Sequence, residues 1–536
     1  MIAPDRLAAA FEVASRDLLA ERDPAGHWVG DLASSSLATA TAVSALSLVR
    51  RERKRADGLF PEDEPDHGID ALIENGIRWL AGQQNADGGW GDAGLCLSNI
   101  SASMLADAAF RLAGKEDEFN DALRGAREYV NAQGGVPGLK KRYGKDKTFA
   151  VPIMTNCALA GQVRWKEIDP LPFEMACLPQ EVLGALQIPV VSYALPALIA
   201  IGLVRFHHGK PFNPLMRWAR SAAVETALKV LQNIQPESGG FLEAVPLTSF
   251  VTMSLTGCGR VAHPVARKGV GFLAETVRPD GSWPIDVNLA TWTTTLSINA
   301  LAAGGQQVHD LGCLDWVLDC QHRVKHPYTA AAPGGWAWID SSGGVPDADD
   351  TGGALLALAA WRESAEQEEV PDDVRIRDAA GRGMTWLLDL QNRDGGWPTF
   401  CRGWGALPFD RSSNDITAHA MRGLFAWHGK LTSQDALSPT MKAKLDRLSL
   451  RIVGAIERGF RYLAREQRAD GSWNPLWFGN QFHPEEDNPV YGTSRVLAVY
   501  RDLNRLADSE ADRGFAWLSK HQNPDGGWGG GPKLAA

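Results

Sequence analysis

Gln391-Asn392-Arg393-Asp394-Gly395-Gly396-Trp397 directly follows the apolar stretch Met384-Thr385-Trp386-Leu387-Leu388, and this combination decides the fold. The same pattern, an aromatic and leucine run followed by Gln, Asp-Gly and Trp, recurs at residues 77–90, 459–473 and 514–528. Weaker copies end at Trp28, Phe241, Trp283 and Trp336. A unit repeated in both halves of a chain determines the architecture before any single residue does.

Each copy has the pattern of an amphipathic helix end followed by a tight turn. The aromatic and leucine side chains fall on one helix face, and Asp-Gly builds the turn. We expect Gln to bond free backbone groups at a neighbouring helix end, while Trp packs over the junction. Helix-like stretches such as residues 37–46 and 296–301 lie between the copies, and strand signals are weak. The pattern predicts an all-α chain closed into a helical toroid.

The composition narrows the class of protein. The 536 residues are 44% hydrophobic and 22% charged, typical of a globular chain with more than one core or a repeat array. A net charge of −10 argues against a nucleic acid partner, because phosphate binding needs clustered Lys and Arg. We interpret the basic run at residues 50–55 as a solvated loop. Seven cysteines without a CxxC pair, and no evident secretion signal, predict a cytoplasmic protein without structural zinc.

Residues 182–204 are nearly all apolar and long enough to cross a membrane. Pro189 and Pro196 interrupt the segment, and the flanking charges give no strong topology signal. Three interpretations stay open: a buried core helix, which we favour, an in-plane membrane contact, and a true span.

A second informative stretch is Pro346-Asp347-Ala348-Asp349-Asp350-Thr351-Gly352-Gly353, at the head of an apolar run. So much like charge in so short a span resists full ionisation, and a carboxyl that keeps its proton at neutral pH can act as an acid. Helix capping is the main structural alternative. A calcium loop that opened at Asp347 would need a carboxylate at its last position, where the chain has Leu358.

The Gln–Trp repeats together with Asp347-Ala348-Asp349-Asp350-Thr351 resemble the squalene-hopene and oxidosqualene cyclase family of class II terpene cyclases, from about Asp17 to Trp528. The resemblance implies two α/α barrels that enclose a large apolar cavity. It places the acid motif on a catalytic barrel of residues 1–29 and 286–536, into which residues 30–285 are inserted as a second barrel.

The resemblance also implies roles for individual residues. Asp349 would deliver a proton to a terminal alkene or epoxide, with Asp347 and Asp350 around it. Residues 412–419 are similar to the family stretch that supplies the acid's histidine partner. By this resemblance His419 takes that role and Asp415 orients the ring. Alkene protonation needs a donor stronger than an ordinary carboxylic acid, and we expect an imidazolium beside Asp349 to stabilise the anion left behind.

Aromatic faces stabilise carbocations without capturing them, and the chain has 19 Trp against 7 Tyr. Many of these Trp belong to the repeats, so their number alone proves little. Residues outside the repeat frame, or matching cavity positions of the family, are predicted to face the cation: Trp338, Trp292, Phe400, Trp477 and Tyr491. Core packing is the alternative for each of them.

Three departures from the family pattern bear on the product. Residues 38–41 read Ala-Thr-Ala-Thr where these enzymes usually offer a Glu on the proton path, and residues 185–197 lack the family's Trp-containing stretch. The chain also ends at Ala536, soon after Trp528, where the hopene-forming enzymes continue with an aromatic segment. We expect this shortened C-terminus to lack one wall of the cavity, which leaves the number of rings and the terminating step open.

We therefore expect an enzyme that cyclises a linear isoprenoid by protonation, with squalene as the leading substrate and no cofactor. Geranylgeranyl diphosphate is the alternative, and it would require magnesium and a basic pocket, for which the candidates are residues 50–55 or Lys140, Lys141, Arg142, Lys145 and Lys147. A non-catalytic binding toroid, or a prenyltransferase subunit of like fold, forms a third class, and the scattered cysteines give no local support for the zinc site of the latter.

The expected substrate is insoluble in water. Together with the apolar residues 182–204, this predicts peripheral contact with the inner face of the cytoplasmic membrane. A homodimer stays open.

Overall fold

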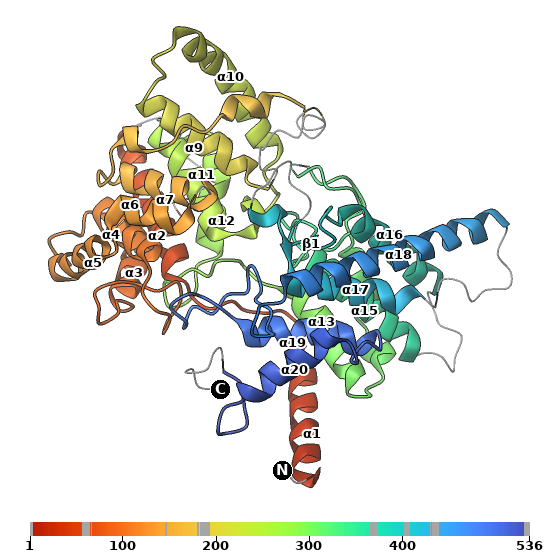
Figure 1. Cartoon of the computed structure of the whole chain (residues 1–536). Helices are drawn as coiled ribbons and strands as arrows, with labels where there is room; N and C mark the ends of the chain where they lie inside the picture. Colours follow the sequence, from red (N-terminus) through yellow and green to blue (C-terminus); the bar gives the residue numbers. More distant parts are fainter. Residues whose placement is uncertain are drawn as a thin grey trace.

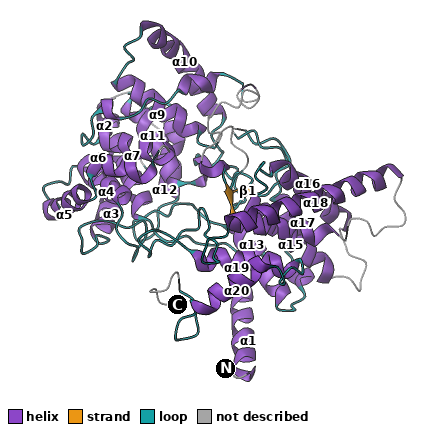
Figure 2. Cartoon of the chain, in the orientation of Figure 1, coloured by secondary structure: helices purple, strands orange, loops and turns teal. Residues whose placement is uncertain are grey.

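The computed structural model describes residues 4–55, 65, 67–144, 147–179, 182, 193–327, 329–364, 373–400, 408–428, 430 and 439–529. Figure 2 shows that these residues are mostly helical, with one short pair of strands between two groups of helices. The prediction of an all-α chain is confirmed.

The first group of helices lies in the red to yellow-green lobe of Figure 1. It consists of α2 (Ser36–Arg55), α3 (Ile69–Ala81), α4 (Ile100–Ala113), α5 (Asn120–Ala132), α6 (Gly135–Tyr143), α7 (Lys147–Leu159), α9 (Leu195–His208), α10 (Pro214–Asn233), α11 (Val245–Gly257) and α12 (Pro264–Glu275). Three 3-10 turns accompany them: η1 (Trp165–Glu167), η2 (Phe173–Cys177) and η3 (Phe241–Glu243).

The second group lies in the green to blue lobe, from which α1 (Pro4–Ala20) projects (Figure 1). It consists of α13 (Ala290–Ala303), α14 (Leu314–Asp319), α15 (Ala348–Ser364), α16 (Asp373–Leu390), α17 (Asn414–His428), α18 (Pro439–Glu466), α19 (Pro489–Asp502) and α20 (Ser509–Lys520). The 3-10 turns η4 (Val308–Leu311) and η5 (Pro408–Asp410) and the antiparallel strands β1 (Trp397–Pro398) and β2 (Ser412–Ser413) belong to the same lobe.

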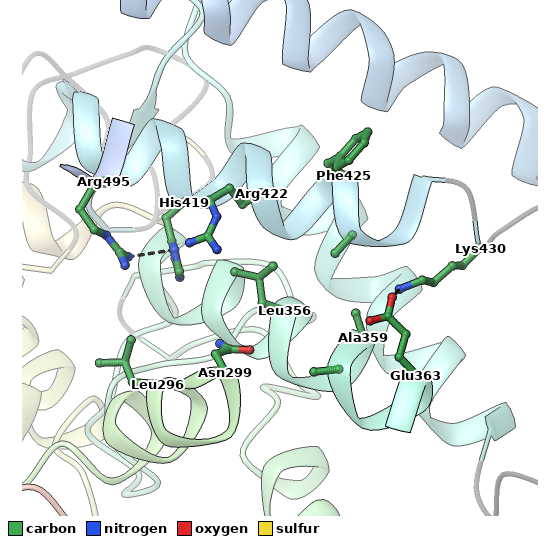
Figure 3. Close-up of a pocket in the computed structure, with 12 residues that line it drawn as sticks. Leu296, Asn299, Leu356, Ala359, Glu363, His419, Arg422, Phe425, Lys430 and Arg495 are labelled. Atoms are coloured by element: carbon green, nitrogen blue, oxygen red, sulfur yellow. Dashed lines mark hydrogen bonds and ion pairs between the residues drawn. The ribbon is translucent and has the colours of Figure 1, made fainter. Parts of the chain in front are cut away.

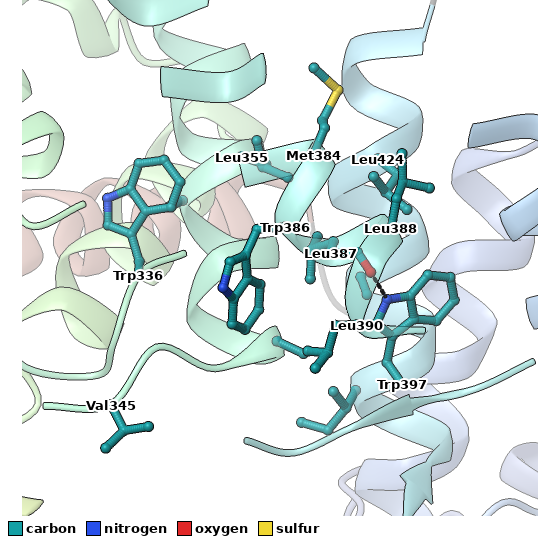
Figure 4. Close-up of a cluster of buried hydrophobic side chains, with 14 of the residues drawn as sticks. Trp336, Val345, Leu355, Met384, Trp386, Leu387, Leu388, Leu390, Trp397 and Leu424 are labelled. Carbon is teal, nitrogen blue, oxygen red and sulfur yellow. Dashed lines mark hydrogen bonds between the residues drawn. The ribbon is translucent and has the colours of Figure 1, made fainter. Parts of the chain in front are cut away.

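The repeats form the contacts that their pattern predicts. Gln391 donates from Nε2 to the carbonyl oxygen of Gly395 in its own turn (2.8 Å) and to that of Ala455 on α18 (2.9 Å), the second helix after it in the chain. Trp397 is fully buried and donates its indole N–H to the Leu387 carbonyl at 2.8 Å (Figure 4). Gln391 therefore ties its turn to the second helix along the chain, while Trp397 closes the helix end that precedes it. The paired Gln bonds recur at Gln84, Gln235, Gln321 and Gln467.

The segment before residue 30 contacts the second lobe. Trp28 donates its backbone N–H to Thr294 Oγ1 on α13 (3.0 Å), Arg22 donates to the Leu311 carbonyl, and the His27 ring stacks on Trp316. Residue 28 also shares its buried apolar cluster with α13, α15 and α17. Residues 22–28 therefore pack on the lobe that carries the acid motif, and the boundaries at 29/30 and 285/286 stay a prediction.

The apolar segment at 182–204 lies only in part within the described residues. Residues 183–192 fall outside them, and the remainder leads into α9, whose residues are mostly buried. Among the helices that the structure describes, none combines the length and the apolar character that a membrane span requires. For residues 195–204 the buried-helix interpretation is correct.

Candidate active site

The acid motif begins where three extended segments meet. Asp347 pairs through its backbone with Trp336 on one side and with Phe400 on the other. Its Oδ1 accepts the backbone N–H of Asp350 at 2.7 Å, which satisfies a free amide in the first turn of α15. The capping interpretation is therefore right for Asp347. The Asp349 carboxyl does not form this capping bond.

Threonine hydroxyls set a common register for the inner helices of the second lobe. Each accepts the backbone N–H of a repeat aromatic residue at 2.9–3.0 Å, the pairs being Thr294 with Trp28, Thr351 with Trp336, Thr417 with Trp397 and Thr493 with Trp473. The residues two positions before these threonines are Trp292, Asp349, Asp415 and Tyr491, which we call the collar. Four of the predicted site residues thus occupy one repeat position, on α13, α15, α17 and α19.

Asp349 lies deep among the collar side chains and is 7% exposed. Its Oδ1 is 3.7 Å from Arg495 Nη2 and 3.9 Å from His419 Nε2. The indole of Trp292 hydrogen-bonds the same carboxyl and lowers its pKa, as does the charge of Arg495, but burial outweighs both and raises the pKa of Asp349 above its usual value. Burial therefore favours the protonated form of this carboxyl.

The flanking carboxyls are held neutral as well. Burial is the main cause that raises the pKa of Asp347 and of Asp350, and the repulsion between the two raises that of Asp350 further. Each retains one buried oxygen, Oδ2 of Asp347 and Oδ1 of Asp350, without a hydrogen-bond partner among the described residues. Full ionisation of the motif would place like charges side by side in a medium that solvates them poorly.

His419 is brought to Asp349, as predicted, but its charge differs from the expectation. Arg495 Nη2 donates a hydrogen bond to His419 Nδ1 at 2.9 Å (Figure 3), so Nδ1 must be an acceptor and the ring proton sits on Nε2, facing Asp349. Burial and the guanidinium groups of Arg495 and Arg422 lower the pKa of His419 well below its usual value. The imidazolium that we expected is therefore wrong for this state, because the nearest charged neighbour is a cation.

The predicted role of Asp415 is also wrong. Its carboxyl accepts a hydrogen bond from Ser413 Oγ, and the described residues show none between Asp415 and His419. Side chains on a helix lean toward its N-terminus, so Asp415 turns to Ser413 rather than to the residue four positions ahead. Burial raises the pKa of Asp415 to about 6, and its buried Oδ2 has no hydrogen-bond partner in the part of the chain that the structure describes.

The aromatic candidates surround the motif as half-buried rings. Trp338 accepts the backbone N–H groups of Thr291 and Trp292 with its carbonyl, and its ring lies 5.8 Å from that of Phe400. Phe409, which the sequence did not single out, links Phe400 (5.0 Å) to Trp477 (4.2 Å). Tyr491 on the collar lies under the Arg495 guanidinium at 5.9 Å. Trp338, Phe400 and Trp477 thus join one aromatic group, while Trp292 and Tyr491 adjoin the acid.

A pocket of about 430 Å³ runs along the helices behind the collar (Figure 3). Its lining includes His419 and Arg495, two positions after the register threonines, then Asn299 and Arg422, and finally the ion pair of Glu363 with Lys430. Asp349 does not line it, so His419 and Arg495 lie between this pocket and the acid. The Glu363 side chain is 55% exposed, which places that end of the pocket at the surface.

The sequence did not identify Arg495, which contacts both His419 and Asp349. The signal that would have found it is the register: Arg495 stands two residues after Thr493, as His419 stands two after Thr417. That correspondence becomes visible only when the threonines are known to share one hydrogen bond.

No group of three or more His, Cys, Asp or Glu capable of holding a metal occurs in the described part of the chain. Several cations considered for a diphosphate are engaged elsewhere: Arg142 pairs with Glu486, Lys147 with Asp169 and Arg50 with Asp70. Lys140 donates to the Glu167 carbonyl, and Lys145 lies outside the described residues.

Comparison with known proteins adds three findings. The family models described as the squalene-hopene cyclase N-terminal and C-terminal domains match residues 11–207 and 288–533. Enfumafungin synthase of Hormonema carpetanum is 27% identical over 95% of this chain, which spans 41% of that protein's length. A squalene–hopene cyclase of Bradyrhizobium diazoefficiens is 24% identical over 96% of this chain and 80% of its own length.

Among solved structures, ent-copalyl diphosphate synthase from Streptomyces platensis matches with a TM-score of 0.52 at 17% identity, covering 97% of this chain and 85% of that one. This likeness concerns the fold, and it agrees with the predicted α/α toroid.

Proposed function

Because the chain belongs to the squalene-hopene cyclase family of class II terpene cyclases, we propose that it cyclises squalene or a related linear triterpene, and that Asp349 starts the reaction by protonating a terminal alkene or epoxide. The observation that carries the proposal is a buried carboxyl with a raised pKa, ringed by groups that stabilise its anion. Such a carboxyl holds its proton until the substrate binds beside it. When the proton passes to the substrate, the neighbouring groups stabilise the carboxylate that is left.

The step at Asp349 follows from its neighbours. The proton leaves the carboxyl for the alkene carbon, and the π electrons form the new C–H bond, so a carboxylate and a tertiary carbocation result. The indole N–H of Trp292 and the Arg495 charge stabilise the carboxylate, as does the positive N-terminal end of the α15 dipole. Since Asp347 and Asp350 stay neutral, neither opposes the anion.

The carbocation requires surroundings without a strong base. Trp338, Phe400, Phe409 and Trp477 offer ring faces, which attract a cation without forming a bond to it. The aromatic group extends through Phe409 to Phe149 of the first lobe, with ring centroids 5.9 Å apart. This supports a substrate site bordered by both lobes.

The test is incubation of the purified chain with squalene, oxidosqualene or geranylgeranyl diphosphate, in detergent and in liposomes, with product analysis by gas chromatography and mass spectrometry. We expect a cyclic product from squalene that EDTA does not suppress and that the D349N variant does not form. Product from geranylgeranyl diphosphate alone, lost on addition of EDTA, would replace the substrate. The absence of product from all three would refute the proposed activity.

We also propose peripheral contact with the cytoplasmic membrane, from which an insoluble substrate would be collected. Support comes from exposed apolar side chains before and along the start of α10: Phe212 is 99% exposed, Leu215 77% and Trp218 73%. Large apolar groups of this kind, with Lys210 and Arg217 beside them, suit a lipid surface. Flotation with anionic liposomes tests it: serine at all three positions should abolish flotation, and unchanged flotation would contradict the proposal.

A further inference from the structure

The charge beside Asp349 can be assigned by following each helix that faces it. Helix α13 offers the neutral indole of Trp292. Asp350 in α15 and Asp347 just before it offer carboxyls whose pKa values burial raises. From α17 come Asp415, His419 and Arg422, and from α19 come Tyr491 and Arg495. Arg422 forms its ion pair with Asp502 on α19.

The hydrogen bond between Arg495 and His419 decides which of them is charged. An arginine N–H can only donate, so a protonated Nδ1 would bring two N–H groups head to head at 2.9 Å. The neutral ring is also locked in place by α15: a Cβ on Gly352 would lie 3.0 Å from His419 Cδ2, and one on Gly353 would lie 3.4 Å from Nε2. The imidazole is thus a fixed acceptor that faces a guanidinium.

On the basis of the proposed function, we propose that Arg495 is the cation that makes Asp349 a strong acid, and that His419 is a positioning residue which holds Arg495 through Nδ1. The sequence predicts that a positively charged His419 stabilises the Asp349 anion; here Arg495 carries the charge and His419 is neutral. The 2.9 Å bond to His419 fixes the guanidinium 3.7 Å from Asp349 Oδ1, near enough to stabilise the carboxylate as it forms. A guanidinium also keeps its charge at every pH at which the protein is folded.

Two variants of His419 test this role, because only one of them keeps a hydrogen-bond acceptor near the position of Nδ1. Asparagine places its side-chain oxygen close to the position of Nδ1 and can accept from Arg495, but it cannot become a cation. Alanine offers no acceptor. We expect kcat to fall by roughly 10²-fold in H419A and to recover to within ~10-fold of the wild type in H419N. If His419 supplied the charge itself, both variants would be equally impaired.

Arg495 variants supply the second readout. Activity requires protonated Asp349, so kcat declines as pH rises through its pKa. The guanidinium holds that pKa down, so R495Q should move the alkaline limb of the kcat profile to higher pH by about 1–3 units while lowering kcat, and R495K should restore part of both. H419N should leave the limb where it is in the wild type. A merely structural role would not shift the limb.

A measurement without substrate keeps this inference distinct from the proposed activity. In protein labelled with ¹⁵N-histidine, the His419 signal, assigned by its loss in H419N, should show an unprotonated Nδ1 and a protonated Nε2 at neutral pH. A His419 with both nitrogens protonated would overturn the proposal, even if the enzyme forms product. So would an unshifted limb in R495Q, or an H419N variant as inactive as H419A. Absence of product in the wild type would instead refute the proposed function.

Discussion

The Gln–Trp contacts can be tested by replacing Gln391 with alanine. Gln391 is 9% exposed, and its loss leaves the buried carbonyl oxygen of Gly395 without this donor and removes a second bond from the carbonyl oxygen of Ala455 inside helix α18. An unsatisfied buried acceptor costs about 1–3 kcal/mol and a lost bond about 1 kcal/mol, so we expect the free energy of unfolding to fall by about 2–4 kcal/mol. Arg458 also loses its acceptor, Gln391 Oε1, but it is exposed and can turn to water.

The chain contains a matched control. Gln522 stands at the same repeat position, but it is exposed, and among the described residues it donates only to the Gly526 carbonyl, at 2.7 Å. Its replacement by alanine should cost less than about 1 kcal/mol, because water can take the place of the lost bond. The two variants therefore remove the same side chain from the same motif in buried and exposed surroundings.

The assay is thermal unfolding followed by circular dichroism and by dye binding. A loss of about 2–4 kcal/mol corresponds to a melting temperature lower by roughly 2–4 °C for Gln391→Ala, against at most ~1 °C for Gln522→Ala. Equal shifts in the two variants would refute the reasoning, since the burial of the lost bonds would then have no effect.

Four further predictions concern the site. Asp349→Asn should lower turnover by at least ~10²–10⁴-fold with little change in melting temperature, and an unchanged rate would remove Asp349 from the role of acid. Gly353→Ala places a Cβ 3.0 Å from Thr295 Oγ1 and 3.4 Å from His419 Nε2, so kcat should fall several-fold, whereas the control Gly381→Ala, which meets nothing within 4 Å, should keep full activity. Burial raises the pKa of Asp415 to about 6, so between about pH 4 and pH 6 the folded chain keeps a proton that the unfolded chain has lost. The free energy of unfolding should therefore decline as pH rises through this range, and Asp415→Asn should flatten the decline in melts recorded from pH 4 to 8. EDTA should leave the rate on squalene unchanged, and inhibition that magnesium reverses would favour a diphosphate substrate.

The fold could be predicted because its main signal is local and repeated. The spacing of ten residues between Leu387 and Trp397 is one helix end plus one turn, and the same indole to carbonyl bond closes Trp90 on Leu80 and Trp473 on Leu463. Short-range regularity of this kind is what a single sequence records best. The partner of each Gln does not follow from the local pattern, because the acceptor lies past an intervening helix: that of Gln391 is Ala455 on α18, beyond α17.

The environment of the acid could be predicted only in part. Asp349 and His419 were identified through motifs, but Arg495 lies 76 residues beyond His419 and belongs to a separate helix. Nothing in the sequence alone shows which side of α19 faces α17. The protonation state of His419 depends on that packing, because one guanidinium turns Nδ1 into an acceptor. Charge at a buried site is set by neighbours in space, and these come from distant segments.

The register threonines have a consequence for how such a site can change. In each inner helix of the second lobe, one hydroxyl serves the scaffold by bonding a repeat backbone N–H, while the residue two positions earlier belongs to the collar. An indole, two carboxyls and a phenol occupy that same position in the four helices. The scaffold bond involves none of these side chains, so it tolerates very different chemistry beside it. The collar residue of one helix can therefore be replaced, and the reactivity of the site changed, without loss of the hydrogen bond that holds that helix in the lobe.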